Sequence, residues 1–272
     1  MNRQNKTPDI RSFGAPQPTD REIDLAAGER RWSIAEETPV AFIYNKRNYA
    51  VMLATPGDIA DFAIGFSLSE RVVESLNQID WIEIHYGEAG VDIRFSIASG
   101  ALERFDLRQQ RRNLVGRAGC GVCGVENADV FIEKLPVVSD KKMAPGRSAL
   151  LRAVRDLPSH QPLNALTRSV HAAAWADHEG RILLAREDVG RHNALDKLVG
   201  ARACARANAS GSAGDGFLVM SSRCSFEIVE KAARAGMGAI VSVSAPTAFA
   251  IRKAQEANIA LFALSDGHIV AF

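Results

Sequence analysis

The residues best suited to chemistry in this sequence are two cysteines, Cys120 and Cys123, which stand three positions apart within Gly119–Gly124. Glycines before, between and after the thiols let the backbone take conformations closed to other residues and let a bulky partner approach the sulfur atoms. The thiolate is the reactive form of cysteine, and the arginines between positions 111 and 117 would favour it if the fold brings them close. The loop therefore indicates either reactive thiols or a metal site.

Three known uses of a Cys-x-x-Cys pair can be compared with the rest of the chain. A structural zinc site needs four ligands, but Cys204, Cys224 and the histidines are scattered. A thioredoxin-like pair stands at the start of a helix after an early strand, which Gly124 and the polar run after it fit poorly. A zinc deaminase needs H-x-E and Pro-Cys-x-x-Cys segments, and neither occurs around His171 or Gly119. No metal site is expected, and the rest of the chain must indicate how the thiols are used.

A polar cluster follows an apolar, strand-like run in the second half. Nine of the twelve residues in Arg186–Lys197 are polar or glycine. Polar groups at the carboxyl end of a strand often mark a ligand crevice. The alternative is a solvated helix start in which Asp188 caps the helix while Asp196 and Lys197 face water.

The same arrangement recurs at Ser221–Glu227 and at Ser244–Thr247, where small hydroxyl residues follow apolar strands and open helices. Hydroxyls, an arginine and backbone N–H groups at a helix start are suited to hold phosphate, although Ser225 is equally suited to cap its helix. Three such turns are expected to line one edge of one sheet.

The hydrophobic pattern indicates the elements that must position these residues. Arg31–Ala54 predicts strands with a turn at Asn45 and Lys46, and Thr55–Asp58 supplies an N-cap and a first-turn proline for a helix that continues from Ile59. Two more strands are predicted at 81–86 and 91–97. From about 170 onward, strand-like and helix-like stretches alternate, which is typical of an α/β fold.

Composition sets the broad class and the expected division of the chain. At 272 residues and 47% hydrophobic residues, the chain can bury a real core. A formal charge of +1 offers no field for nucleic acid or a membrane surface, and no apolar run suits a membrane helix or signal peptide, so we expect a cytoplasmic protein. Residues 1–20 predict a flexible arm, 21–140 an α+β region ending in the cysteine loop, and 141–272 an α/β domain.

Several ordered motifs make the chain resemble the FdhD family of formate dehydrogenase accessory sulfurtransferases. They are TPGDIADFAIGF at 55–66, GCGVCG at 119–124, REDVGRHNALDK at 186–197, SSRCSFEIVEKAARAG at 221–236 and VSVSAPT at 241–247. The resemblance spans about Arg31 to the C-terminus.

The resemblance implies a sulfurtransferase that accepts a persulfide from a cysteine desulfurase and passes sulfur to the bis-molybdopterin guanine dinucleotide cofactor of formate dehydrogenase. It further implies a homodimer that serves the catalytic subunit of formate dehydrogenase, and a cytidine-deaminase-like three-layer α/β fold without the catalytic zinc. On this interpretation Cys120 carries the persulfide and Cys123 assists, resolves or protects it. The candidate cofactor-binding residues come from the polar turns and the C-terminal segment: Arg191, His192, Asn193, Ser222, Arg223, Ser225, Leu264, Ser265, Asp266, Gly267 and His268.

Two segments depart from the family pattern. Family members have Thr-Gly-Gly ahead of a strand histidine, where this chain has Arg168 and Ser169 in place of the glycines. Near the C-terminus, His268 and Phe272 stand where the family has a basic residue and a tyrosine, and Asp266 brings a negative charge. The loss of both glycines predicts a changed backbone geometry at that turn. The C-terminal differences predict weakened cofactor binding or an altered ligand.

Other functions stay open at this level. The chain could serve another molybdenum or tungsten enzyme, or act as a chaperone that binds the cofactor without transferring sulfur. A zinc-stabilised α/β binding module is a third alternative, which metal content would reveal.

Overall fold

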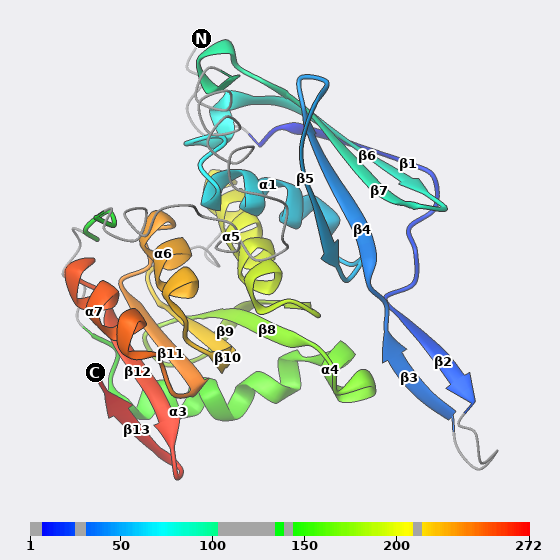
Figure 1. Ribbon diagram of the computed structural model, residues 1–272. Helices are drawn as coiled ribbons and strands as arrows, with labels where there is room; N and C mark the ends of the chain where they lie inside the picture. The colour runs from blue at the N-terminus through cyan, green and yellow to red at the C-terminus, as the bar shows by residue number, and fades with distance from the viewer. Residues whose placement is uncertain (1–6, 25–30, 103–133, 139–143, 209–213) are drawn as a thin grey trace.

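The computed structural model describes residues 7–24, 31–102, 134–138, 144–208 and 214–272. Cys120 and Cys123 lie outside the described residues, as does the expected domain boundary between 140 and 141. The described chain forms two main sheets, with two helices crossing between them (Figure 1).

The N-terminal sheet has five strands in the order β1-β6-β7-β4-β5. Their bounds are β1 (Asp9–Phe13), β4 (Thr38–Tyr44), β5 (Arg47–Ala54), β6 (Ile79–Gly87) and β7 (Gly90–Ile97). The turn predicted at Asn45 and Lys46 is confirmed: it joins β4 to β5 as a hairpin, with positive φ angles of 46° and 69°. The strands predicted at 81–86 and 91–97 are β6 and β7, which pair as a second hairpin. Stacked rings of Phe42, Phe66 and Phe95 fill the core between this sheet and α1 (Ile59–Ser69).

Two expectations for this half are wrong. The flexible arm expected over 1–20 contains β1, which pairs in parallel with β6 through backbone hydrogen bonds that composition does not reveal. The helix expected to be capped around Thr55 begins at Ile59, after Asp58 in the left-handed region. Thr55 is instead bonded to the second half of the chain: its backbone N–H donates to Asp188, and its hydroxyl accepts from the Val189 N–H.

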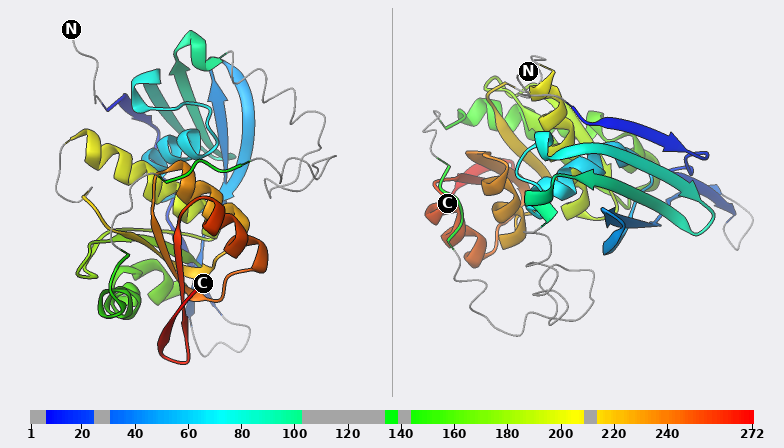
Figure 2. Two further views of the ribbon diagram at one scale, coloured as in Figure 1. Left: turned by 90° about the vertical axis from the view of Figure 1, so that its left-hand side faces the viewer. Right: turned by 90° about the horizontal axis from the view of Figure 1, so that it is seen from above.

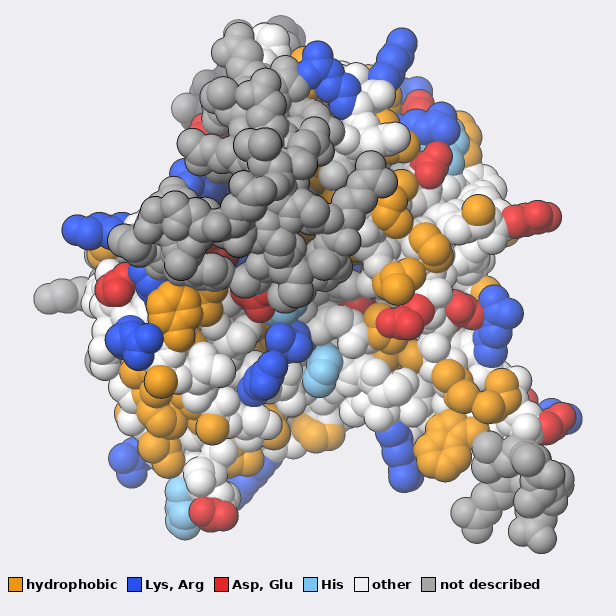
Figure 3. Space-filling model, in the orientation of Figure 1, with side chains coloured by type: hydrophobic (Ala, Val, Ile, Leu, Met, Phe, Trp, Pro, Cys, Tyr) orange, Lys and Arg blue, Asp and Glu red, His pale blue; other side chains and the backbone are white. Residues whose placement is uncertain are grey.

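A two-stranded ribbon projects from the body, and hydrophobic side chains gather over it (Figures 1 and 3). It pairs β2 (Asp20–Asp24) with β3 (Arg31–Ala35). Ile23, Trp32 and Ile34 are more than 40% exposed on it.

The C-terminal sheet has six strands in the order β13-β12-β11-β10-β8-β9. Its strands are β8 (His171–Ala176), β9 (Ile182–Asp188), β10 (Phe217–Arg223), β11 (Ala239–Ser244), β12 (Ala260–Ser265) and β13 (His268–Ala271). The helices of this half are α3 (Arg147–Asp156), α4 (Pro162–Thr167), α5 (Arg191–Ala207), α6 (Phe226–Arg234) and α7 (Ala248–Glu256), and the short 3-10 helices of the chain are η1 (Leu76–Gln78) and η3 (Leu157–His160).

These elements form three layers, so the predicted α/β class is confirmed. One face of the sheet packs on α3 through Phe217, Val219 and Leu150. The other face packs on α5, α6 and α7 through residues that include Trp175 and Met220. Figure 2 (left) shows α3, in green, on the side of the sheet opposite α6 and α7.

Helices α1 and α5 join the two halves by a very close crossing (Figure 1). A Cβ atom built on Gly65 would lie 1.6 Å from the Asp196 carbonyl oxygen, and one on Gly200 would lie 2.0 Å from the Asp61 carbonyl oxygen. Because real Cβ atoms never approach backbone so closely, only glycine fits at either position.

Candidate functional site

The three polar turns expected to share a sheet edge do share one. Strands β9, β10 and β11 run in the same direction, because β10 is parallel to β11 and both β9 and β10 are antiparallel to β8. Their carboxyl ends therefore meet at one edge, where α5, α6 and α7 begin. Three helix N-termini place partial positive charge and unpaired N–H groups there, which suits an anionic ligand.

The edge is long because β12 and β8 contribute to it as well. His171 opens β8 opposite Asp188, Arg223 pairs with Ser244, and β12 runs parallel to β11 toward Ser265. Four strand spacings separate β12 from β9, so the polar row extends over about 19 Å. A row of this length is suited to an extended ligand such as a dinucleotide.

Arg191 and His192 form one end of the candidate site. Both lie in the first turn of α5 and are half-buried. The His192 Nε2 atom lies 2.9 Å from Glu227 Oε2, but without hydrogen-bond alignment. Nε2 of His192 and Nε of Arg191 are buried and have no hydrogen-bond partner among the described residues. Such nitrogens cost free energy unless another group satisfies them, so both are ready to bond a ligand atom.

Ser222, Arg223 and Ser225 form the middle of the candidate site. Arg223 is exposed at the end of β10, whereas Ser222 is buried and its hydroxyl donates to the Arg223 carbonyl. Ser225 stands at the N-cap of α6, but its side chain makes no capping hydrogen bond and lies 3.4 Å from Glu227. Thr247 is the hydroxyl that does cap, because it accepts from the Ala250 N–H at the start of α7.

The C-terminal candidates form the tip of a β-hairpin at the same edge. Asp266 and Gly267 make the turn between β12 and β13 with φ angles of 49° and 79°. Ser265 and His268 pair across it and are exposed, whereas Leu264 is half-buried. Strand β11 lies between this hairpin and Arg223, so the hairpin forms the end of the polar row opposite Arg191 and His192.

The side chain of Asn193 bonds the two halves of the chain together. It is 4% exposed, and its amide nitrogen donates to the Leu53 carbonyl and to Asp188. Asp188 is completely buried, pairs with Lys197 at 2.7 Å, and accepts from the Thr55 and Gly190 N–H groups. We therefore assign Asn193 to the contact between the two halves rather than to ligand binding.

A second buried network joins three helices. Asp196 of α5 accepts from Ser69 of α1 at 2.6 Å and from Lys231 of α6 at 2.8 Å. Burial raises the pKa of Asp196 against the opposing pull of Lys231. Burial alone would lower the pKa of Lys231, but the attraction of Asp196 and Glu70 outweighs it and raises that pKa. The alternative in which Asp196 and Lys197 face water is wrong, because both are essentially unexposed.

Two residues of the site have no role that the sequence alone indicates. His171 reaches it by opening β8 between β9 and β10, and Glu227 faces His192 from α6. Glu227 lies within the 221–236 motif and His171 is the strand histidine that follows Arg168 and Ser169, but strand order decides that both reach the site. Arg168, in place of a family glycine, ends α4 in the left-handed region with φ 55°. The backbone geometry that glycine would favour is thus retained by an arginine.

We expect His171 to titrate below the ordinary histidine pKa of 6.5 in the folded protein. Burial lowers its pKa most, and Arg191 lowers it further. The unfolded chain therefore binds a proton more readily, so this residue's contribution to stability is present above pH 6.5 and lost as pH falls from 6.5 through the folded pKa. An NMR titration should show the lowered pKa, and a higher value in Arg191→Gln. A pKa at or above 6.5 in the wild type would contradict this expectation.

The two cysteines that the structure describes are unpaired and poorly suited to attack. Burial raises the pKa of Cys204 to about 11 and that of Cys224 to about 12. A thiol with so high a pKa is almost entirely protonated at neutral pH. Among the described residues, no three His, Cys, Asp or Glu side chains are grouped as metal ligands.

The fold defines a three-layer α/β protein with a polar edge at the carboxyl ends of parallel strands, which is the edge where ligands of such sheets bind. The model of the FdhD/NarQ family matches residues 35–270. This chain belongs to the FdhD/NarQ family.

Curated relatives agree with this assignment. The chain is 47% identical to the sulfur carrier protein FdhD of Bordetella petrii, over 84% of the chain and 80% of the relative. It is 45% identical to the protein of the same name from Xanthomonas euvesicatoria, over 86% and 81% of the two chains. A crystal structure described as a formate dehydrogenase accessory protein from Desulfotalea psychrophila has the same fold, with a TM-score of 0.66, 23% identity, and coverage of 93% of this chain and 94% of that one.

Within the described part of the chain, no helix is long and apolar enough to cross a membrane.

Proposed function

We propose that this protein is a sulfur carrier, which takes a persulfide sulfur from a cysteine desulfurase and transfers it to the bis-molybdopterin guanine dinucleotide cofactor for formate dehydrogenase. The sulfur carrier function named for relatives 47% and 45% identical to this chain supports the carrier role. The donor, the cofactor and the receiving enzyme are the finer parts of the proposal, as are a homodimeric state and a cytoplasmic location.

The contrast between the four cysteines carries the proposal. Cys204 and Cys224 have raised pKa values because they are buried. Cys120 and Cys123 stand in the glycine-flanked loop sequence, with three arginines between positions 111 and 117. Because the thiolate is the nucleophile, these two are the candidates for sulfur chemistry.

The proposed steps balance with the donor persulfide and the two loop thiols, and a thiol reductant must reopen the resulting disulfide before another turnover. The Cys120 thiolate attacks the outer sulfur of the donor persulfide, the donor S–S bond breaks, and the donor leaves as a thiolate. Cys120 then carries the persulfide. Attack of the Cys123 thiolate on the inner sulfur of that persulfide forms a Cys120–Cys123 disulfide and expels the outer sulfur as sulfide, which is the oxidation state of a metal sulfido ligand.

The polar edge of the C-terminal sheet is the proposed binding site of the cofactor, which is a substrate of this protein. Arg191, His192 and Arg223 supply cationic or donor groups, and three helix N-termini supply N–H groups for phosphates. The row of about 19 Å suits a ligand that carries nucleotides at both ends. Asp266 and His268 at the hairpin tip would modify the affinity at one end.

The test is intact-mass analysis of the protein after incubation with a cysteine desulfurase and cysteine. We expect the wild type to gain about one sulfur atom, roughly 32 Da, in a form removed by reductant, because a carrier thiolate accepts sulfane sulfur. Cys120→Ala should lose the gain completely, and Cys123→Ala should keep it.

Cys204→Ala and Cys224→Ala are the matched controls, since each removes a thiol that burial keeps protonated. Both should load sulfur as the wild type does. Absence of a mass gain in every protein would favour the alternative of a chaperone that binds the cofactor without transferring sulfur. A gain that survives in Cys120→Ala would assign the carrier role to another cysteine.

A further inference from the structure

A pocket lies far from the polar edge, at the C-terminal half of α5. It has a volume of about 300 Å³ and is lined by residues from the end of α1, the η1 segment, α5, and the turn after α6. Arg191 and Arg206 are fifteen positions apart on α5, which at the rise of a helix separates their Cα atoms by about 22 Å. The pocket is therefore distinct from the proposed cofactor site.

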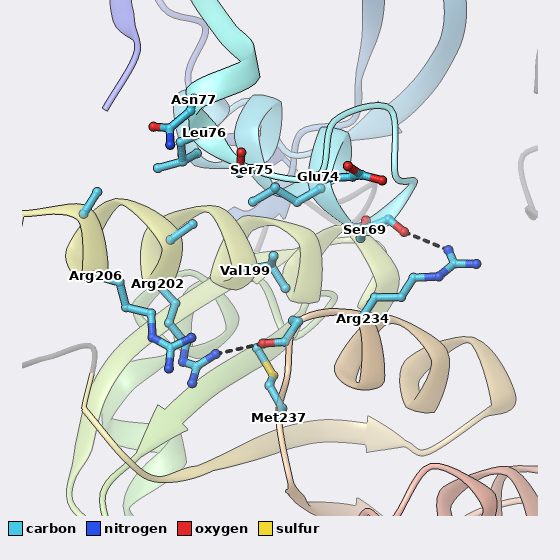
Figure 4. A pocket seen from close by; sticks show the side chains of 14 residues that line it. Ser69, Glu74, Ser75, Leu76, Asn77, Val199, Arg202, Arg206, Arg234 and Met237 are labelled. Carbon is cyan, nitrogen blue, oxygen red and sulfur yellow. Dashed lines mark hydrogen bonds between the residues drawn. The ribbon is translucent and has the colours of Figure 1, made fainter. Parts of the chain in front are cut away.

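Two arginines one helical turn apart give this pocket its charge. Arg202 and Arg206 extend side by side from α5 (Figure 4). Arg206 is exposed, whereas Arg202 is only 5% exposed. Figure 4 also shows Arg234 at the other end of the pocket, where it donates to the Ser69 carbonyl. Arg234 is also paired with Glu230 at 2.7 Å, so its side chain is held in place as part of the pocket lining.

Arg202 is held in place but incompletely satisfied. Its guanidinium lies 3.8 Å over the Trp175 ring, and one terminal nitrogen donates to the Ala235 carbonyl at 3.2 Å. Its Nε atom is buried and has no hydrogen-bond partner among the described residues. Arg202 also makes no ion pair with a carboxylate in the described part of the chain, although Asp215 attracts it through space.

The electrostatics of Arg202 favour an incoming anion. Burial lowers its pKa to about 10, and the neighbouring charge of Arg206 contributes to the decrease. The group still carries its proton at neutral pH. An anion between Arg202 and Arg206 would relieve their repulsion and bond the free Nε atom.

We propose that this pocket binds the phosphate group of a small phosphate ester, with Arg202 and Arg206 as the phosphate ligands. Guanidinium groups match phosphate oxygens in geometry and in charge. Leu76, Val199 and Met237 give the rest of the lining an apolar part, and Ser75 and Asn77 a polar part, so the remainder of a mononucleotide fits better than a free ion. Glu74 also lines the pocket, near Arg234 and away from Arg202 and Arg206 (Figure 4), so the phosphate is assigned to the end with the two α5 arginines.

Basic residues in the last turn of a helix also interact favourably with its negative end, which is the alternative explanation for Arg206. Arg155 occupies the matching position in the last turn of α3, on the opposite face of the sheet. Helix stabilisation alone would make Arg155→Gln and Arg206→Gln equivalent in a binding experiment.

The experiment is calorimetric titration of the full chain with GMP, inorganic phosphate and guanosine. In an Arg191→Gln/Arg223→Gln variant, in which the proposed cofactor site is impaired, we expect GMP to bind once per chain with an affinity that falls as salt increases, phosphate to bind more weakly, and guanosine not to bind. Arg206→Gln should weaken GMP binding about tenfold, as loss of a charge-assisted hydrogen bond does, and Arg155→Gln should leave it unchanged. Arg202→Met should weaken it further.

An Arg191→Gln/Arg223→Gln variant separates this pocket from the proposed cofactor site. GMP binding that persists in this variant and weakens about tenfold on adding Arg206→Gln supports the pocket. No saturable binding of GMP by the wild type, equal affinity in Arg206→Gln, or equally tight binding of guanosine would overturn the proposal. None of these outcomes depends on sulfur loading, so the proposed function stands or fails separately.

Discussion

Replacing Lys197 by methionine is expected to lower the free energy of unfolding by about 3–5 kcal/mol, because the change leaves the buried charge of Asp188 without its partner. Lys197 is completely buried and lies 2.7 Å from Asp188, which is also completely buried. Its ammonium group further donates to the carbonyls of Thr55 and Glu187. Methionine keeps the volume of the side chain and removes all three interactions.

The measurement is chemical denaturation monitored by circular dichroism, with Lys253→Met as the matched control. Lys253 is 4% exposed, but its partner Glu256 is about half exposed. A pair with one solvated member contributes little, so the control should lose at most about 1 kcal/mol. Equal decreases in the free energy of unfolding of the two variants would show that burial of the lysine, and not its pairing with Asp188, determines the cost.

Hydrogen exchange gives a local measure of the same change. The Thr55 N–H donates to Asp188, and the Val189 N–H donates to the Thr55 hydroxyl. Both amides lie where the N-terminal sheet meets the C-terminal domain. Lys197→Met should accelerate their exchange more than that of amides in the middle of β10, because the pair that organises this contact is removed.

The sequence is informative wherever an element buries its own apolar face. In the second half, strands and helices alternate as predicted, because short apolar runs that are buried along their length stand between amphipathic helical stretches. The shared edge of the polar turns is confirmed for the same reason. Parallel strands that alternate with helices must bring their carboxyl ends together.

The wrong predictions for Thr55, Asp196 and Lys197 have one cause, which is that the residues bonded to them lie far away in the sequence. Thr55 looks like a helix cap locally, but it bonds to Asp188, 133 positions away. Asp196 and Lys197 look like solvent-facing helix residues, but Lys231, Ser69 and Asp188 bury and pair them. No local pattern shows such partners, so polar residues of the second-half motif could be recognised as a group without being divided into ligand-binding and structural members.

The second large effect is expected at the crossing of α1 and α5. Gly200→Ala should lower the free energy of unfolding by about 2–3 kcal/mol, because overpacking of a tight interface has this typical cost. The new Cβ would lie 2.0 Å from the Asp61 carbonyl oxygen and 2.9 Å from the Gly65 nitrogen, and both are backbone atoms that rotamer changes cannot move. The helices must therefore separate.

Helix propensity alone predicts that Gly200→Ala raises the free energy of unfolding. The direction of the measured change therefore distinguishes the two effects. Alanine in place of glycine within a helix is favourable by about 1 kcal/mol when nothing obstructs the methyl group. Gly100 provides that control, because no atom of the described residues lies within 4 Å of the position that a Cβ would take there, and its φ angle is not in the left-handed region. Gly100→Ala should leave the stability unchanged or raise it slightly, whereas stabilisation by Gly200→Ala would contradict the close crossing.

The double variant distinguishes a shared displacement from two separate clashes. A Cβ on Gly65 would lie 1.6 Å from the Asp196 carbonyl oxygen, on the same crossing. If one separation of α1 from α5 relieves both contacts, the loss in Gly65→Ala/Gly200→Ala will be smaller than the sum of the single losses. That same separation would stretch the Ser69–Asp196 hydrogen bond of 2.6 Å, so a sub-additive loss should be accompanied by faster exchange of amides around Ser69.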